Sequence, residues 1–432
     1  MIRNRLAIVT LLTGLNFLNY LDRFIVAAVL PRIKAAFSLS DFEGGLLATV
    51  FLLGYFVTAP IFGTLGDRMP RKWLIAVGVL VWSAATIASG LATGLGTLIA
   101  ARVAVGIGEA SYATLAPTII DDISPPEQKG RMLAVFFLAV PVGSALGYLT
   151  GSQVQNTSLG WQGAFFLGGG PGIALAFVCL LIAEPARQLS KVKIAMVGAA
   201  RTLARIPLYR RGVLGYCAHT AAIGAFSHWG PTFLVRQFPG PVASLADEAA
   251  RDAAAKAALA SAGFWFGTVL VVAGAIGTIV GGRLADRALR SLPPMPADAS
   301  HEHPANRLAA NAQLRVCALG VALAFPFTAV AFFAQSATQF YVLSGIAEIG
   351  LFMSAAPINA IMLRTAPVYL RASAMAVGIF SIHLFGDLWS PALLGLLLDN
   401  LELIPAMLSL PACFALAALI WWPRRHEAEP EA

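Results

Sequence analysis

The sequence predicts an all-α membrane protein in which twelve transmembrane helices form two pseudo-symmetric six-helix bundles. Two observations carry this prediction: a composition that water cannot solvate, and motifs that recur in the two halves of the chain. Of the 432 residues, 58% are hydrophobic and only 12% are charged, and the mean hydropathy is +0.75. Soluble globular proteins carry about 25% charged residues. Lipid is therefore the solvent of most of this surface, and a soluble domain is excluded.

Twelve apolar segments have the length of about 20 residues that a bilayer requires. They cover residues 7–36, 44–66, 73–94, 97–122, 131–155, 163–184, 211–236, 262–286, 313–335, 338–364, 371–398 and 403–422. The first is interpreted as an uncleaved span, because it contains Asp22 and Arg23 and has no signal-peptide cleavage motif at its end. In the loop before the eighth span, the Ala-rich segment from Leu245 to Ala260 predicts a short exposed helix.

The 30 Lys and Arg residues indicate the orientation of the chain. With both termini and the even-numbered loops in the cytoplasm, nearly all of them face that side, where short loops are enriched in basic residues. The exceptions are the two within spans and five on the opposite side: Arg23 and Arg102, and Arg32, Lys34, Arg236, Arg251 and Lys256. We therefore expect a multi-pass protein of the inner (plasma) membrane with both termini cytoplasmic. The net charge of +8 needs no nucleic-acid partner.

The second half of the chain repeats motifs of the first. Gly63-Thr-Leu-Gly-Asp67-Arg68 after span 2 returns as Gly282-Arg-Leu-Ala-Asp286-Arg287 after span 8, and Gly106-Ile-Gly-Glu109 in span 4 returns as Gly345-Ile-Ala-Glu348 in span 10. Such repeats predict two halves in parallel register about an axis along the membrane normal. We place the N-terminal bundle at 1–186 and the C-terminal bundle at 211–432. The basic segment 187–210 between them predicts an amphipathic helix on the cytoplasmic surface.

Short motifs also resemble known families. Gly63-x-x-x-Asp67-Arg68-x-Pro70-x-Lys72 resembles the loop 2–3 signature of the major facilitator superfamily, except that Pro70 replaces the usual glycine. Three motifs are similar to patterns of the Spinster family of lipid transporters: Asn19-Tyr-Leu-Asp22-Arg23-Phe, Pro141-Val-Gly-Ser-Ala-Leu-Gly-Tyr148 and His383-Leu-Phe-Gly-Asp387-Leu-Trp-Ser-Pro391. The resemblance implies alternating access and a lysolipid or sphingosine-phosphate substrate. It also implies a cytoplasmic conformational gate formed by Gly63, Asp67, Arg68, Asp286 and Arg287.

Ionisable residues inside the predicted spans are the candidate functional residues. One such side chain at the bilayer centre costs about 2.5–3.5 kcal/mol on insertion scales, so its presence indicates a function. They are Asp22 and Arg23 in span 1, Arg102 and Glu109 in span 4, Glu348 in span 10, and His383 and Asp387 in span 11. In the superfamily, spans 1, 4, 7 and 10 line one cavity, so the resemblance implies that these groups meet.

For the first half we expect Arg102 to be shared between the carboxylates of Asp22 and Glu109. Proton uptake by either acid would release Arg102 and change which state of the cavity is favoured. Arg23 or Arg102 would also bind an anionic head group, because guanidinium groups pair with phosphate in fork geometry. The alternative is a structural charge network that only locks the two helices together.

For the second half, His383 is expected to titrate near neutral pH, and Asp387 lies one turn further on the same face. A polar pair between helices is the alternative for these two residues. Glu348 is expected to pair with such a group or with substrate. Trp229, beside Gly-Pro231 in span 7, either lines the cavity or anchors the helix at the membrane interface.

The sequence offers no phosphate-binding loop that would supply energy from a nucleotide, since Gly168-Gly-Gly-Pro-Gly172 lacks the required lysine. We therefore expect a secondary active transporter and not an enzyme. It would act as a monomer without cofactor or metal, and it would move an amphipathic lipid-like anion or zwitterion together with protons. A proton-coupled carrier of small organic acids or drugs remains an alternative. A non-transporting membrane receptor or a lipid enzyme is an alternative of another class.

Overall fold

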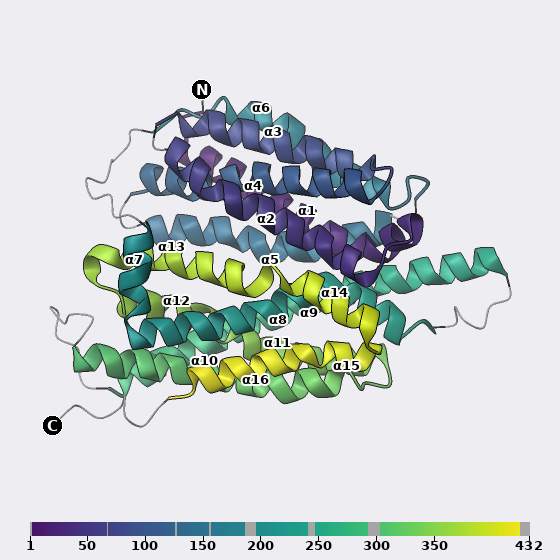
Figure 1. The fold of residues 1–432 in the computed structure, drawn as a ribbon. Coiled ribbons are helices and arrows are strands. Elements are labelled where there is room, and N and C mark those ends of the chain that lie inside the picture. Colours follow the sequence, from purple (N-terminus) through teal and green to yellow (C-terminus); the bar gives the residue numbers. More distant parts are fainter. Residues whose placement is uncertain are drawn as a thin grey trace. The chain divides into compact units, whose positions relative to one another are not determined.

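The computed structural model describes residues 2–66, 68–125, 128–154, 157–185, 196–240, 247–292 and 303–423. Helices dominate these residues, as expected (Figure 1). Their bounds are α1 (Arg5–Phe37), α2 (Asp41–Gly66), α3 (Arg71–Gly90), α4 (Leu95–Ile123), α5 (Lys129–Val154), α6 (Gln162–Cys179), α7 (Met196–Ala204), α8 (Pro207–Gln237), α9 (Glu248–Arg290), α10 (Pro304–Ala331), α11 (Ala337–Phe352), α12 (Ala355–Arg364), α13 (Arg371–Ile382), α14 (Ser390–Asn400), α15 (Leu403–Met407) and α16 (Ser409–Trp421).

Within the described ranges, ten helical segments are long and apolar enough to cross a membrane by length and composition. Two further helices, α1 and α8, have 33 and 31 residues and are therefore also long enough. Their apolar sequences contain charged and polar residues, which include Asp22 in α1 and His219 in α8. With these two helices, the described part of the chain provides a helical segment for each of the twelve predicted spans.

Three predicted elements differ in detail from the helices that form. The loop helix that we expected from Leu245 to Ala260 is continuous with span 8, so α9 runs unbroken for 43 residues. Span 10 is divided into α11 and α12, and span 11 contains a π-helical turn at His383–Asp387. In the linker, α7 is the described helical part, and residues 187–195 lie outside the described residues.

Small residues set how closely helices of the first half approach one another. The principal contacts of α1 are with α5, those of α2 with α4, and those of α3 with α4 and α6. A Cβ atom added at Gly143 or Gly147 of α5 would lie 2.6 Å from Phe17 O and 2.5 Å from Leu21 O of α1. This glycine stripe therefore lets α5 lie directly on α1, as small residues do in membrane bundles.

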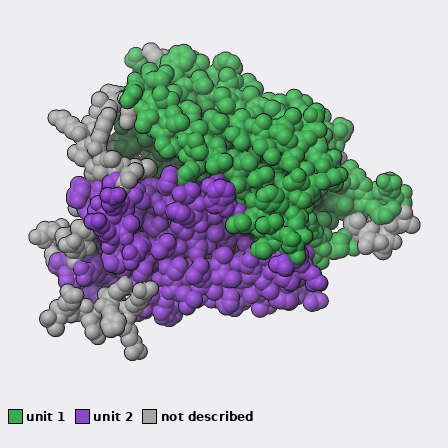
Figure 2. Space-filling model, viewed as in Figure 1, with its two compact units in different colours: residues 1–190, 227–268, 391–400 green, residues 191–226, 269–390, 401–432 purple. Residues whose placement is uncertain are grey.

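The chain forms two compact units, which Figure 2 colours separately. Unit 1 comprises Met1–Ser190, Ser227–Thr268 and Pro391–Asn400, and unit 2 comprises Lys191–Phe226, Val269–Ser390 and Leu401–Ala432. These units differ from the sequence-based domains 1–186 and 211–432, because two segments of the second half pack with the first half. The division at 187–210 stays a prediction about symmetry and not about compactness.

Specific hydrogen bonds hold those two segments in unit 1. The Tyr148 hydroxyl donates to Ser227 O at 2.5 Å. At the start of α2, the carboxylate of Asp399 accepts the backbone N–H groups of Asp41 and Phe42, each at 2.7 Å. Asp399 therefore caps a helix that begins more than 300 residues earlier in the chain, where the partial positive charge of a helix N-terminus favours an anion.

Candidate functional site

Helices α1 and α4 place four charged side chains inside unit 1. Asp22 and Glu109 are fully buried, Arg102 is 2% exposed, and the side chain of Arg23 is 18% exposed. Asp22 and Arg23 are neighbours on α1, so their side chains leave the helix about 100° apart. As the sequence predicted, each of them interacts with a residue of another helix.

Glu109 is paired with Arg23. Arg23 Nε donates to Glu109 Oε2 at 2.7 Å. Our expectation that Arg102 is shared between Asp22 and Glu109 was therefore wrong about the direct partner of Glu109. Arg102 and Glu109 lie two turns apart on one helix, about 10 Å along its axis, whereas Arg23 reaches Glu109 from α1.

Aromatic rings surround the two guanidinium groups. Cζ of Arg23 lies 5.0 Å from the ring centroid of Tyr20, 5.1 Å from that of Phe51 and 5.2 Å from that of Tyr55. Cζ of Arg102 lies 4.9 Å from the centroid of the same Phe51 ring. These are cation–π distances, and such contacts are strongest where water is excluded. The sequence did not single out Phe51, because nothing in α2 alone indicates that two cations approach it.

Asp22 is directed toward α3 and α6. Its Oδ2 accepts a hydrogen bond from Thr86 Oγ1 at 2.7 Å, while Oδ1 has no hydrogen-bond partner among the described residues. A Cβ atom added at Gly168 of α6 would lie 3.3 Å from Oδ1. A glycine at this position thus leaves room for the carboxyl group. Asp22 interacts with Arg102 and Arg23 electrostatically and not through a direct hydrogen bond.

The cluster is neutral in total when all four groups are ionised, but it is incompletely hydrogen-bonded. Within the described chain, Arg102 Nε and Nη1, Asp22 Oδ1 and Glu109 Oε1 are buried without a partner. Buried polar atoms are nearly always paired, and an unpaired one carries a desolvation penalty. These charged donors and acceptors are therefore open to a proton, a water molecule or a polar ligand.

Unit 2 carries a lone carboxyl group in the repeat of the same motif. Glu348 on α11 corresponds to Glu109, is 7% exposed, and its Oε2 has no hydrogen-bond partner in the described ranges. The motif repeat therefore extends to burial, since both glutamates lie inside their units. The ion pair is not repeated, because no basic residue in the described part of the chain is paired with Glu348.

His383 and Asp387 pair within one helix. Nδ1 of His383 lies 2.9 Å from Asp387 Oδ1, and the two residues are the ends of the π-helical turn. We left open whether they pair between helices; the contact observed is intrahelical. Gly224 of α8 packs against this turn, since a Cβ there would lie 2.5 Å from Asp387 Cβ. π-Helical turns occur frequently at functional sites.

Trp229 has a different position from the two that we expected. It is fully buried, its Nε1 donates to Pro391 O at 2.9 Å, and Lys34 Nζ lies 5.6 Å from its ring centroid. The indole therefore neither anchors α8 at a lipid interface nor presents surface to a cavity. It packs unit 1 together around the start of α2, where Gly44 leaves room for the ring.

The residues of the expected gate are at the ends of helices. Asp67 lies outside the described residues. Gly63 faces Thr114 of α4, and Arg68, Asp286 and Arg287 are exposed. Their role as a gate therefore rests on the motif alone and stays a prediction.

A charge network that the sequence did not predict lies beside the loop 2–3 motif. Arg71 at the start of α3 forms ion pairs with Asp122, at 2.7 Å, and with Glu184, at 3.2 Å. Glu184 also accepts the backbone N–H groups of Arg71 and Lys72, each at 3.1 Å. The signal was present, since acidic residues end spans 4 and 6 on the side where the basic loop 2–3 was placed.

Comparisons with known proteins agree with this architecture. A profile of the Major Facilitator Superfamily matches residues 12–382. Protein spinster homolog 1 of Homo sapiens is 34% identical over 418 residues, which cover 91% of this chain and 73% of the human protein. The sphingosine-1-phosphate transporter SPNS2 of Danio rerio is 32% identical over 402 residues, which cover 90% of this chain and 75% of the fish protein.

Solved structures share the fold. A bacterial homologue of the human lysosomal transporter Spinster, in an inward-facing and unoccupied conformation, has a TM-score of 0.77 at 22% identity and covers 98% of this chain and 97% of its own. A bacterial Spinster homologue in an inward-facing and occupied conformation has a TM-score of 0.80 at 20% identity, and the match covers 100% of both chains. The relatives are transporters and not enzymes. The chain is thus a multi-pass membrane transporter of the major facilitator superfamily, and within that superfamily it belongs to the Spinster family.

Proposed function

We propose that the protein is a secondary active transporter that moves an amphipathic lipid-like anion or zwitterion, of the lysolipid or sphingosine-phosphate type, together with protons. The observation that carries this proposal is Arg102, a fully desolvated guanidinium whose Nε and Nη1 have no partner among the described residues. A buried charge of this kind costs several kcal/mol. Its retention is explained if it binds an anion during the transport cycle.

The head group of the substrate is assigned to Arg23 and Arg102. Both guanidinium groups contact the Phe51 ring, so one phosphate near this ring can accept hydrogen bonds from Arg23 and from Arg102. The aromatic rings around Arg23 provide apolar surface beside the charge, which suits an amphipathic molecule. The SPNS2 relative is a sphingosine-1-phosphate transporter, which supports the same chemical class.

Proton coupling is assigned to Asp22 and Glu109, with Arg102 as their electrostatic partner. In this structure Arg23 is ion-paired with Glu109, so an anion that binds Arg23 must compete with the Glu109 carboxylate. Protonation of Glu109 removes that competitor. By linkage, a bound anion then favours the protonated acid, and the protonated acid favours the bound anion. Proton and anion are thus taken up together.

Three residues of unit 2 are assigned to substrate binding as well. The Glu348 carboxylate has an unpaired oxygen, and the His383–Asp387 pair is partly exposed. An ammonium or choline group of a zwitterionic substrate is the expected partner of a carboxylate. Trp229 is omitted from this assignment because its indole is fully buried and its Nε1 donates to Pro391 O.

The remaining assignments follow from the sequence. We place the protein in the inner membrane as a monomer with both termini in the cytoplasm, because its basic loops mark that side. Gly63, Asp67, Arg68, Asp286 and Arg287 are assigned to the cytoplasmic gate that opens and closes in alternating access.

The test is transport by the purified protein in liposomes. Labelled lysophosphatidylcholine and labelled sphingosine 1-phosphate are offered with and without an inward proton gradient, and protein-free liposomes are the blank. We expect uptake of at least one lipid, and faster uptake with the gradient. Gradient-driven uptake restricted to small organic acids would favour the alternative carrier. Binding without any transport would show a receptor and overturn the proposal.

A further inference from the structure

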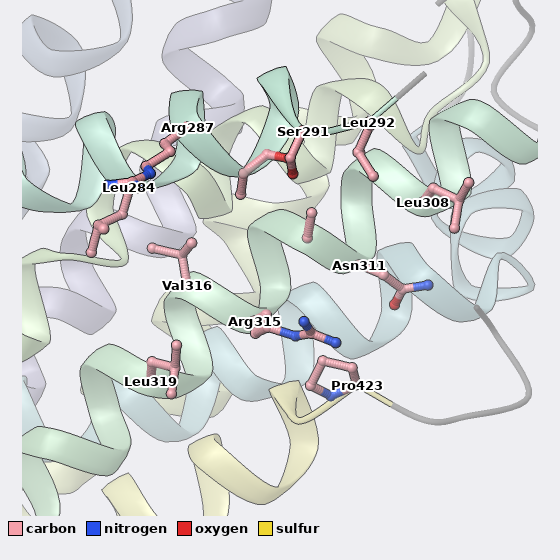
Figure 3. A pocket seen from close by; sticks show the side chains of 12 residues that line it. Leu284, Arg287, Ser291, Leu292, Leu308, Asn311, Arg315, Val316, Leu319 and Pro423 are labelled. Carbon is pink, nitrogen blue, oxygen red and sulfur yellow. The ribbon is translucent and has the colours of Figure 1, made fainter. Parts of the chain in front are cut away.

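Unit 2 contains a half-open cavity of about 470 Å³ between the end of α9 and the first half of α10, and Pro423, two residues after α16, also lines it (Figure 3). The side chains that line it are Leu284, Arg287, Ala288, Ser291, Leu292, Leu308, Asn311, Ala312, Arg315, Val316, Leu319 and Pro423. None of these residues belongs to the buried charge clusters described above. The cavity is therefore separate from the proposed substrate and proton sites, and it shares only Arg287 with the residues assigned to the gate.

The polar lining of the cavity is positively charged. Arg287 and Arg315 are exposed, and neither guanidinium forms an ion pair within the part of the chain that the structure describes. Among the described residues the lining contains no acidic side chain, and its other polar side chains are those of Ser291 and Asn311. Two unneutralised guanidinium groups at one cavity are a site for an anion, and phosphate fits their fork geometry.

An apolar stripe leads away from the two arginines. On α10, Leu319 and Leu323 follow Arg315 at intervals of four residues and are exposed. On α9, Leu284 and Ile276 precede Arg287 by three and eleven residues, which places them on the same side of the helix, and both are exposed. Residues spaced by three and four lie on one face of a helix. Both helices thus present a guanidinium followed by hydrocarbon surface in the direction of the bilayer interior.

The level of the arginines in the membrane fits a head group. Arg287 directly follows the predicted span 262–286, and Arg315 lies at the start of the predicted span 313–335. Basic pockets between transmembrane helices at this boundary bind the head groups of acidic lipids. A soluble anion would use the guanidinium groups but not the leucine and isoleucine surface beside them.

We propose that this cavity binds the phosphate of an anionic membrane phospholipid, of the phosphatidylglycerol class, with one acyl chain along the stripe of α9 and α10. The lipid is a resident ligand and not the transported molecule. It neutralises Arg287 and Arg315 and ties the end of α9 to α10. Anionic lipid therefore stabilises the protein.

The probe is dioctanoyl phosphatidylglycerol, added to the full-length protein in neutral detergent. Bound lipid is counted by native mass spectrometry, and stability is followed by the unfolding temperature. The variant is Arg287→Gln with Arg315→Gln. Its matched control is Arg283→Gln with Arg307→Gln, which removes two exposed arginines from the same two helices outside the cavity lining. Dioctanoyl phosphatidylcholine and glycerol phosphate are the comparison ligands.

We expect phosphatidylglycerol to bind the wild type more tightly than phosphatidylcholine and to raise its unfolding temperature. At about 1 kcal/mol for each arginine near an anionic lipid, the cavity variant should bind roughly tenfold or more weakly, and the control should bind as the wild type does. The unfolding temperature without lipid should be the same in all three proteins, because the four arginines are exposed.

Three results would overturn the proposal. Equal losses in the two double variants would show general surface charge instead of a site. An equal response to glycerol phosphate would show a site for a soluble anion. Lipid binding that appears only after Glu427, Glu429 and Glu431 are changed to Gln would assign the cavity to the acidic C-terminal segment of the chain itself. None of these readouts depends on transport, so the proposed function can fail while this site stands.

Discussion

Arg23 and Glu109 form a direct ion pair between α1 and α4, with Nε 2.7 Å from Oε2. The other two charged groups of the cluster, Asp22 and Arg102, have buried polar atoms without a hydrogen-bond partner among the described residues. Glu109 is fully buried and the Arg23 side chain is nearly so. A buried pair of this kind contributes little net stability as a unit, but each half is costly without the other. In the proposed function, this pair is the place where one proton is coupled to one guanidinium.

The first prediction concerns the stability of this pair. Glu109→Gln or Arg23→Gln alone should lower the free energy of unfolding by about 3 kcal/mol, because each leaves an uncompensated buried charge. The double variant should lose clearly less than the two single losses together. Unfolding of the four proteins of this cycle in detergent measures the coupling energy. Additive losses would contradict a direct interaction, and Glu402→Gln, an exposed acid, is the control for charge removal.

The second prediction concerns the pH dependence of transport. Glu109→Gln mimics the protonated acid permanently, so Arg23 is released at every pH. Gradient-driven uptake should fall toward the level without a gradient, while exchange of labelled for unlabelled substrate should persist. Asp22→Asn should weaken the pH dependence as well, since Asp22 interacts with Arg102 and Arg23. An unchanged pH dependence in both variants would remove the coupling role from these acids.

The positions of the charged groups along the chain were predictable, but their partners were not. Adjacent residues on a helix diverge by about 100°, so Asp22 and Arg23 had to interact with different helices, and they do. Which helices these are depends on how α1, α3, α4 and α6 are rotated about their axes. That rotation is set by contacts such as Gly143 and Gly147 against α1, which the pattern of one helix does not encode.

Breaks within helices were also missed. Span 10 is divided after Phe352 and span 11 contains a π-helical turn; Pro357 and Pro391 lie four residues after Met353 and Asp387, and a proline cannot donate to the carbonyl four residues before it. Hydropathy reports only whether a residue prefers lipid, and it does not distinguish an α-helix from a π-helical turn. The Arg71 network shows the opposite case, since its acidic partners were visible at span ends but only the structure brings them within 3.2 Å.

The third prediction concerns the glycines of α6, whose sequence is similar to part of a phosphate-binding loop but whose role is packing. A Cβ at Gly169 would lie 2.5 Å from the Ser83 carbonyl oxygen of α3, whereas a Cβ at Gly170 would meet nothing within 4 Å. Gly169→Ala should therefore lower the unfolding temperature, because the backbone of α3 must move. Gly170→Ala should leave the unfolding temperature unchanged or raise it, because alanine favours the helix over glycine by up to about 1 kcal/mol. Equal effects would mean that α3 and α6 are not this close.

The fourth prediction concerns Asp252, which accepts from Arg32 Nη1 at 2.6 Å and pairs with Lys256 Nζ at 2.8 Å. The hydrogen bonds from Lys256 and Arg32 hold the pKa of Asp252 below its ordinary value of 3.8. A lowered pKa stabilises the folded state above the unfolded-state value, and this contribution is lost as the pH falls through the folded-state value.

The difference in unfolding temperature between the wild type and Asp252→Asn should therefore be small, positive and constant from about pH 5 to pH 8. It should shrink as the pH falls below about 4 and vanish once the pH is below the folded-state pKa of Asp252. The contribution to the free energy of unfolding is at most about 1 kcal/mol, because the Asp252 side chain is 44% exposed and water screens the ion pair. A difference that varies within the neutral range would show that another group titrates with Asp252.

The fifth prediction concerns Asp399, which joins the end of α14 to the start of α2 by accepting two backbone N–H groups at 2.7 Å. Asp399→Asn keeps an acceptor but loses the charge that favours a helix N-terminus, and Asp399→Ala loses both. We expect stability to fall in that order, by about 1–2 kcal/mol for alanine. Asn400→Ala is the matched control, since the side chain of Asn400 donates to Leu396 O within its own helix.

The same contact has a consequence for transport. Asp399 belongs to the second half of the sequence and α2 to the first, so the proposed alternating access between the two halves would require this cap to break once in each cycle. Asp399→Ala should therefore populate the state in which the cap is open. If Asp399→Ala lowers stability no more than Asn400→Ala does, the cap is not a stabilising contact, and the closing of this end must depend instead on the Asp41–Arg236 ion pair.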